Sequence, residues 1–109
     1  MKLRWTDRSL RDLIDIGHYI ARDKPGAARR WVERLRRSAR TAAKQPFAGR
    51  RVPEVGRDTV REVLVGNYRI VCEIQKKEIR ILTVFEGHRP LPDSAVRGLD
   101  SPGDKSTQG

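Results

Sequence analysis

The sequence predicts an α+β fold in which an N-terminal edge strand and an antiparallel helical hairpin accompany a small antiparallel β-sheet. Apolar residues recur at intervals of three and four between residues 7 and 44, and after residue 59 they recur at intervals of two. The second region is interrupted by two-residue gaps, which are typical of β-hairpins. We therefore expect the helical hairpin to cover one face of the sheet.

The first half of the chain is expected to hold one strand and two helices. Lys2–Trp5 alternates polar and apolar residues, and its brevity and positive charge suit a strand at a sheet edge. Thr6 is a typical N-cap residue, so a first helix is predicted over about residues 7–22. Pro25 favours the first turn of a second helix, over residues 25–44. Two helices joined so closely must lie antiparallel.

Each predicted helix carries an apolar stripe that should face the sheet. In the first helix the stripe consists of Leu10, Leu13, Ile14, Gly17, Ile20 and Ala21. In the second helix it consists of Ala28, Trp31, Val32, Leu35, Ala39 and Ala42. The opposite face of the second helix holds most of its arginines, so that face should meet solvent or a partner.

The second half is expected to form a three-stranded antiparallel meander over residues 60–65, 68–75 and 78–86. A two-residue turn in the second hairpin would place four pairs under the helices. These pairs are Ile74 with Ile79, Cys72 with Ile81, Ile70 with Thr83, and Tyr68 with Phe85. The other face would show Arg69, Val71 and Glu73, and would stay solvated or meet a partner. In the first hairpin the direction of Arg61 remains open.

The last segment of the chain has a different composition. Residues 93–109 are rich in Ser, Gly, Asp, Pro, Lys, Thr and Gln, and only Ala95, Val96 and Leu99 are apolar. Such a segment buries too little surface to offset the entropy of ordering it. The sequence therefore predicts a single domain over residues 1–92, followed by a disordered tail.

The composition excludes several classes of protein. A chain of 109 residues makes one domain at most, and its apolar runs fall far short of the roughly 20 residues that cross a bilayer. With no signal-like segment at its start, a cytoplasmic protein without membrane contact is expected. Cys72 is the only cysteine, and His18 and His88 are the only histidines. We therefore expect no disulfide, no metal and no cofactor.

The positive charge is concentrated in one segment. The chain has 24 Lys and Arg residues against 14 Asp and Glu, a formal net charge of +10. Between Lys24 and Gln45 the cations have a single acidic counterpart, Glu33. Such a run suits a densely anionic partner, either nucleic acid or an acidic protein segment. A solvated helix face is the commoner reason for a basic run.

An ordered set of short motifs resembles the RelE/ParE superfamily of toxins from type II toxin–antitoxin modules. The set spans about Lys2 to Arg89. It comprises Asp12-Leu13, Tyr19-Ile20-Ala21-Arg22-Asp23-Lys24-Pro25, Gly49-Arg50, Val52-Pro53-Glu54, Val60-Arg61-Glu62, Tyr68-Arg69-Ile70-Val71, Ile81-Leu82-Thr83-Val84 and Gly87-His88-Arg89. Its order and spacing carry the resemblance, since no single motif is specific alone.

The resemblance implies a growth-inhibiting toxin silenced by a cognate acidic antitoxin, and it allows a toxin–antitoxin hetero-oligomer. RelE-like members cleave mRNA on the ribosome without a metal, whereas ParE-like members act on DNA gyrase. The long hairpin and the elements around Arg61 and Arg69 look more like the ParE side, so gyrase is the preferred target and a non-enzymatic protein is favoured. A metal-independent mRNA endoribonuclease is the first alternative, and a basic nucleic-acid-binding module or degenerate toxin is the second.

The same resemblance suggests site residues. Arg69 corresponds to an arginine that ribonuclease members place near the phosphate, and His88 lies near the position of their C-terminal histidine. Glu62 or Glu86 would supply a carboxylate base. Arg61, Arg69 and Arg89 would bind phosphate or the target. The ending His88-Arg89-Pro90-Leu91-Pro92 departs from the tyrosine or lysine-rich end of many RelE-type members, which weighs against catalysis.

Two of these assignments have plain structural alternatives. Arg69 would equally pair with Glu62 or Glu73 across the sheet, and His88 without a fixed partner is more typical of a surface loop. For the antitoxin, Arg30, Arg34 and Arg37 are the predicted contacts, because a basic helix attracts acidic side chains. An exposed sheet edge that accepts an added strand is the second predicted docking surface.

Overall fold

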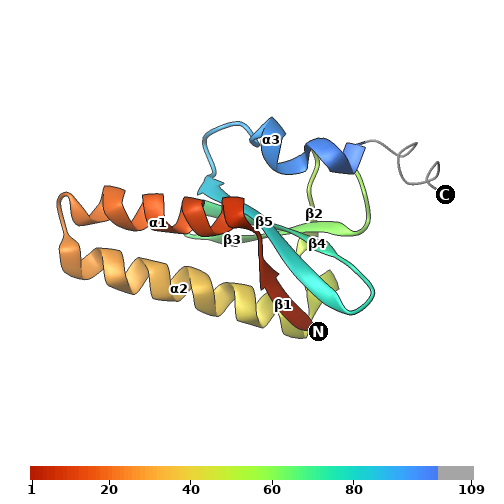
Figure 1. The fold of residues 1–109 in the computed structure, drawn as a ribbon, viewed down its shortest axis with the longest axis horizontal. Helices are drawn as coiled ribbons and strands as arrows, with labels where there is room; N and C mark the ends of the chain where they lie inside the picture. Colours follow the sequence, from red (N-terminus) through yellow and green to blue (C-terminus); the bar gives the residue numbers. More distant parts are fainter. Residues whose placement is uncertain (101–109) are drawn as a thin grey trace.

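The structure, a computed structural model, describes residues 1–100. Its elements are β1 (Lys2–Trp5), α1 (Asp7–Ala21), α2 (Pro25–Lys44), η1 (Pro46–Ala48), β2 (Arg50–Arg51), β3 (Val60–Val65), β4 (Tyr68–Ile74), β5 (Glu78–Glu86), α3 (Asp93–Val96) and η2 (Arg97–Asp100). The five strands form one sheet in the order β1-β5-β4-β3-β2. The α1–α2 hairpin covers one face of this sheet (Figure 1). The predicted α+β architecture is confirmed.

The helical hairpin is fixed to the sheet at the start of α1. Thr6 is the N-cap, as predicted, and its Oγ1 accepts the Ser9 N–H at 3.2 Å. The Thr6 N–H also donates to the Ile81 carbonyl at 3.2 Å, so the cap joins α1 to β5. Leu13 and Leu35 are buried between the helices and the sheet.

The apolar stripe of α1 is centred differently from the prediction. Ser9 and Leu13 are the buried residues of α1, whereas Leu10 and Ile14 are 40% and 56% exposed. The prediction that Leu10 and Ile14 face the core is therefore wrong. The buried residues lie toward the sheet, and an apolar residue one position further along the chain is rotated by about 100° around the helix axis.

The sheet is mixed, because β1 pairs parallel with β5 and the other pairs are antiparallel. β1 forms one edge, as predicted. The short β2 forms the other edge. Beyond the end of β1, Asp12 of α1 accepts bonds from the Thr83 hydroxyl at 2.6 Å and the Val84 N–H at 3.1 Å. Asp12 thus takes the place of a neighbouring strand there.

A β-bulge changes the register of the second hairpin. The predicted pairs Ile74 with Ile79 and Cys72 with Ile81 are confirmed. Past the irregularity between Val71 and Cys72, the structure pairs Ile70 with Val84 and Tyr68 with Glu86, so the predicted pairs with Thr83 and Phe85 are wrong. One extra residue on β5 moves Phe85 to the other face of the sheet.

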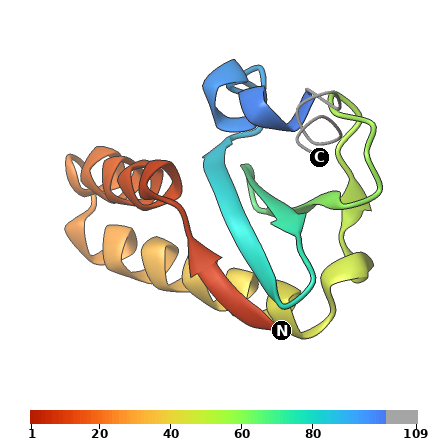
Figure 2. The same cartoon turned by 45° about the vertical axis from the view of Figure 1, so that its right-hand side comes forward.

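That second face is largely covered, not solvated. Its core cluster consists of Val52, Val60, Val71, Leu82, Phe85 and Val96, with Val55, Leu91, Ala95 and Leu99 packed against it. Figure 2 shows α3 lying over the sheet on the side away from the α1–α2 hairpin. The bulge adds Phe85 to the apolar surface of this face, and burial of that surface explains why α3 is ordered.

The predicted domain end at Pro92 is therefore too early. Val96 is 6% exposed, and α3 is joined to α1 by a hydrogen bond from Arg8 Nη1 to Ser94 Oγ. The Arg57 guanidinium likewise donates to the Leu99 carbonyl. The predicted disorder is wrong for residues 93–100, and residues 101–109 lie outside the described part of the chain. Within residues 1–100, no helix is long and apolar enough to span a membrane.

Candidate functional site

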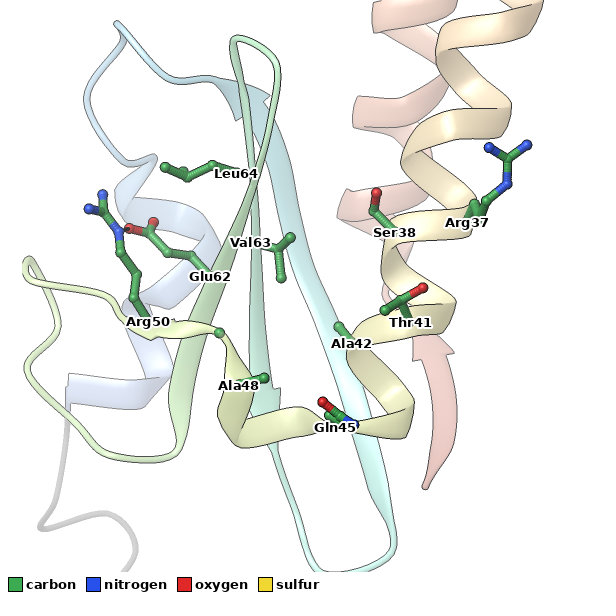
Figure 3. A pocket seen from close by; sticks show the side chains of 11 residues that line it. Arg37, Ser38, Thr41, Ala42, Gln45, Ala48, Arg50, Glu62, Val63 and Leu64 are labelled. Atoms are coloured by element: carbon green, nitrogen blue, oxygen red, sulfur yellow. Dashed lines mark hydrogen bonds and ion pairs between the residues drawn. The ribbon is translucent and has the colours of Figure 1, made fainter.

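A groove of about 470 Å³ lies between the C-terminal half of α2 and the outer edge of the sheet (Figure 3). Figure 3 shows residues of α2 on one side of the groove and residues of β3 on the other. The lining residues are Arg37, Ser38, Thr41, Ala42, Gln45, Ala48, Gly49, Arg50, Glu62, Val63 and Leu64. The groove thus combines small apolar side chains with hydroxyl, amide and guanidinium groups.

The sheet edge beside this groove is open. β2 pairs with β3 only as far as Glu62, so the outer backbone of residues 63–65 pairs with no strand in the described chain. Leu64 is 54% exposed on this edge. An unpaired edge next to a groove is a typical place for an extended peptide to add a strand.

Gly49 explains how the chain leaves this edge free. A Cβ atom at Gly49 would lie 2.8 Å from the carbonyl oxygen of Glu62, closer than real Cβ contacts allow. Only glycine permits this approach between the start of β2 and β3. The chain between η1 and β2 therefore crosses close to Glu62 and leaves the rest of the β3 edge uncovered.

A row of arginines runs along α2 and reaches the groove at Arg37. Arg30, Arg34 and Arg37 are spaced by four and three residues, so they share one side of α2, and all three are exposed. The Arg34 guanidinium carbon lies 4.8 Å from the centre of the Trp31 ring, and Arg37 lines the groove. None of the three forms an ion pair within residues 1–100. The predicted antitoxin-binding residues thus share one side of α2, and Arg37 is the one that lines the groove.

The other charged residues of the edge form a closed network on the second face of the sheet. The side chain of Glu62 is buried and accepts bonds from Arg50 Nε at 2.5 Å and Arg69 Nε at 2.6 Å. The Arg69 guanidinium also donates two bonds of 2.9 Å to the carboxylate of Glu54. These bonds lower the pKa of Glu54 and raise the pKa of Arg69.

The burial of Arg69 contradicts its expected exposure. Arg69 is 9% exposed and lies 5.0 Å from the centre of the Phe85 ring, because the second face is covered by the β2–β3 connection and the C-terminal segment. The alternative prediction, an ion pair with Glu62, is confirmed. Glu62 is held by two guanidinium groups, so neither candidate is open to a phosphate or a ribose hydroxyl.

The remaining catalytic candidates lie together at the turn after β5. His88 Nδ1 is 2.5 Å from Glu86 Oε2, and both side chains are at the surface. The bond to Glu86 raises the pKa of His88 and lowers that of Glu86. Arg89 lies one residue further and lines a separate cleft of about 1110 Å³ beside α1. No hydrogen bond within residues 1–100 joins this turn to Glu62 or Arg69.

Arg61 has a structural role in this arrangement. It pairs with Cys72 in a regular two-residue hairpin, so its side chain lies on the helix side of the sheet. It donates to Asp58 Oδ1 at 2.7 Å and to the Gly49 carbonyl at 2.9 Å, and its guanidinium lies 5.1 Å from the centre of the Phe47 ring. These contacts hold the connection between α2 and β2.

Several residues of the site were not singled out from the sequence. Arg50 and Glu54 complete the network, and Ser38, Thr41 and Gln45 line the groove. The sequence signal for Arg50 and Glu54 is their opposite charge at a spacing of four residues, which indicates neither a partner nor a distance.

Cys72 is a free cysteine with a buried side chain. Burial raises the pKa of the Cys72 thiol to about 12, so it stays protonated near neutral pH. Residues 1–100 contain no group of three or more His, Cys, Asp or Glu side chains placed to hold a metal ion.

Comparison with known proteins gives a consistent result. Residues 3–91 match the family model described as ParE toxin of type II toxin-antitoxin system, parDE. A protein of Sinorhizobium fredii named Putative toxin Y4kP is 34% identical over 93 residues, which cover 84% of this chain and 93% of that protein. A solved structure, the chromosomal ParDE TA system from P. aeruginosa, superposes with a TM-score of 0.66 at 24% identity, over 79% of this chain and 95% of that chain.

Proposed function

The chain belongs to the ParE family of toxins from type II toxin–antitoxin systems, and from this membership we propose that it arrests growth by acting on DNA gyrase in the cytoplasm. We propose further that a cognate acidic antitoxin neutralises it in a hetero-oligomeric complex. The observation that carries the choice of target is the network around Arg69. A ribonuclease needs its phosphate-binding arginine free, and here that arginine is buried between two carboxylates.

Gyrase inhibition and mRNA cleavage are separated by two assays on the purified protein. We expect the protein to inhibit supercoiling by gyrase and to leave mRNA intact on translating ribosomes. Cleavage at the ribosomal A site that is lost in His88→Ala would overturn the proposal. His88 is the appropriate residue for this control because it is exposed, whereas removal of the buried Arg69 would also destabilise the fold.

The groove beside α2 is the proposed docking site of the antitoxin. An extended acidic segment would add to the open β3 edge through main-chain hydrogen bonds. Its carboxylates would meet the row of Arg30, Arg34 and Arg37, and its apolar side chains would enter the groove beside Leu64. Support comes from the unpaired edge, the exposed leucine and the absence of ion pairs to these arginines within residues 1–100.

The polypeptide encoded beside the gene is the probe for this docking site. Charge reversal at Arg30, Arg34 and Arg37 should slow its association and reduce the dependence of the association rate on salt, because the row steers an acidic partner. Equal reversal of Arg4, Arg51 and Arg97, which are exposed elsewhere, is the matched control. If both triple variants behave alike, the helix row is not the docking surface.

Growth arrest distinguishes the toxin from a basic nucleic-acid-binding module. Such a module would bind DNA in a salt-sensitive way and would not arrest growth when expressed. We expect growth arrest on induced expression in the absence of the antitoxin.

A further inference from the structure

One end of the molecule is a basic surface built from three separate segments of the chain. Figure 1 and Figure 2 both show the N-terminus beside the C-terminal end of α2, with the turn between β4 and β5 next to it. The Lys2 N–H donates to the Lys77 carbonyl at 3.3 Å, and α2 contacts both β1 and β5. We call this surface the basic end, and its exposed cationic residues are Met1 with its N-terminal amine, Lys2, Arg4, Lys44, Lys76 and Lys77.

The basic end has little compensating negative charge. Glu78 is the carboxylate that pairs with it, at 3.7 Å from Arg4 Nη1, and the same carboxylate also pairs with Arg80 at 3.3 Å. The four lysines of the basic end form no ion pair within residues 1–100. One carboxylate is therefore shared by two guanidinium groups, and the surface keeps a net positive charge that the described chain does not neutralise.

The lysines of the β4–β5 turn are not explained by the geometry of that turn. Two-residue hairpin turns favour Gly, Asn and Asp, because these residues adopt positive φ readily. The β3–β4 turn follows this rule with Gly66, whose φ is +59°. Lys76 and Lys77 join β4 to β5 instead, and neither has positive φ. These two like charges repel each other and the neighbouring Lys2, so the arrangement suits a surface that meets negative charge.

The chemistry of the basic end favours nucleic acid over a protein segment as its partner. A protein interface is centred on apolar or aromatic anchors, and Met1 is the one large apolar side chain exposed among the described residues of these three segments. A positively charged edge strand also disfavours the addition of a peptide strand, and β1 carries Lys2 and Arg4. Contacts to a phosphate backbone need only cationic and polar groups at the surface.

The spacing of these cations suits duplex DNA, which is also the substrate of the proposed target. DNA carries one negative charge for about every 1.7 Å of its axis, and adjacent strands of a sheet are about 4.8 Å apart. Lys2 pairs with Glu78, the residue that follows Lys77, so the cations of β1 and of the turn lie on neighbouring strands. They are therefore close enough together to contact neighbouring phosphates.

We propose that the basic end binds the phosphate backbone of duplex DNA, so that the toxin contacts the DNA held by gyrase as well as the enzyme. Lys2, Lys76 and Lys77 contact the phosphates, and Arg4 and Lys44 flank them. Binding is independent of base sequence, because it uses the backbone alone. The inference rests on the proposed action on gyrase, and it uses a surface other than the groove proposed for the antitoxin.

The test measures binding of the full chain to a short fluorescent DNA duplex by anisotropy, over a range of salt concentrations. The triple variant Lys2→Gln, Lys76→Gln and Lys77→Gln, called the lysine variant below, should bind at least about ten-fold more weakly, because phosphate contacts are lost. The slope of log affinity against log salt concentration should become shallower by about one for each lost contact. Circular dichroism checks that all variants are folded.

The triple variant Arg11→Gln, Arg22→Gln and Lys24→Gln is the matched control for net charge. These three cations are exposed on α1 and in its turn to α2, and they form no ion pair within residues 1–100. The control should keep the salt slope of the unmodified chain. Equal loss of affinity in both triple variants would show a general effect of charge and would overturn the proposal.

A gyrase supercoiling assay and the polypeptide encoded beside the gene separate this proposal from the earlier ones. If the unmodified chain inhibits gyrase but does not bind the duplex, or if the lysine variant binds it equally well, the gyrase proposal stands and this one is overturned. If the lysine variant loses affinity for the polypeptide and not for DNA, the surface meets a protein and the proposal is likewise overturned. If the unmodified chain does not inhibit gyrase, the proposed target is wrong, and the DNA measurement alone decides whether the basic end binds the backbone.

Discussion

Arg69 Nε donates a 2.6 Å hydrogen bond to the buried carboxylate of Glu62. Glu62 is fully enclosed, and Arg50 covers it from the edge of the sheet. This pair joins β4 to β3, and the contact of Arg69 with Glu54 ties the β2–β3 connection over the second face. A residue that the family resemblance suggested for catalysis therefore has a structural role.

Loss of Arg69 is expected to destabilise the fold. Arg69→Ala would leave Glu62 buried with only Arg50, and breaking a buried pair costs about 3–5 kcal/mol. Arg4→Ala, which removes the exposed pair with Glu78 at 3.7 Å, should cost less than about 1 kcal/mol. Urea unfolding measures both. Equal values for the two variants would contradict a structural role for the network.

Acid should weaken the same network through Glu54. Its pKa is lowered by the hydrogen bonds from Arg69, so the stability it contributes is complete above its ordinary pKa of 4.5 and is lost as the pH falls through the lowered value. Glu54→Gln should therefore be less stable than the unmodified chain at neutral pH, and this difference should shrink in acid. A difference in unfolding free energy that stays constant from neutral pH into the acid range would rule out this linkage.

The C-terminal segment is expected to contribute to stability. Val96→Asp places a carboxylate in the second core, where Val96 is 6% exposed, and should cost about 2–4 kcal/mol from lost burial and desolvation. Arg97→Asp, at an exposed neighbouring position, is the control for the change of charge. Thermal unfolding compares the two variants. If Val96→Asp and Arg97→Asp unfold at the same temperature, the C-terminal segment does not contribute to the stability of the second core.

Two glycines with positive φ, Gly66 in the β3–β4 turn and Gly56 in the β2–β3 connection, provide a matched test of how the β3–β4 turn packs. Gly66 has φ +59°, and a Cβ atom there would lie 2.5 Å from Cη2 of Trp31, whereas Gly56 has φ +70° and nothing within 4 Å of that position. Each alanine substitution should lower the unfolding free energy by about 1 kcal/mol because of backbone strain. Gly66→Ala should cost at least about 1 kcal/mol more, because the Trp31 ring must move. The test measures the unfolding free energy and the near-ultraviolet signal of tryptophan for both variants. Equal effects of Gly66→Ala and Gly56→Ala would show that Trp31 does not pack on the turn.

Much of the fold follows from local patterns in the sequence. The bounds of α2, β3 and β5 agree with prediction because a proline, a glycine turn and alternating apolar residues mark them. The register beyond Val71 does not follow, since the bulge depends on which face of the sheet receives Phe85. The C-terminal segment was misjudged for the same reason, because its few apolar residues are ordered only by a core that the bulge creates.

The site was predictable only in part. The spacing of Arg30, Arg34 and Arg37 places them on one side of a helix whatever lies beside it. The groove next to them depends on Gly49 and on how early β2 ends, and neither is visible in a periodic pattern. The function of Arg69 was ambiguous because a sequence does not say whether an arginine on a sheet meets solvent or a carboxylate.

Growth of cells that express this chain, with and without the polypeptide encoded beside its gene, tests the central claim most directly. Induction of the chain alone should arrest growth, and co-expression of the neighbour should restore it. The variant with Arg30, Arg34 and Arg37 changed to Glu should escape this rescue. Normal growth on induction, or full rescue of the charge-reversed variant, would contradict a toxin that is silenced through the arginines of α2.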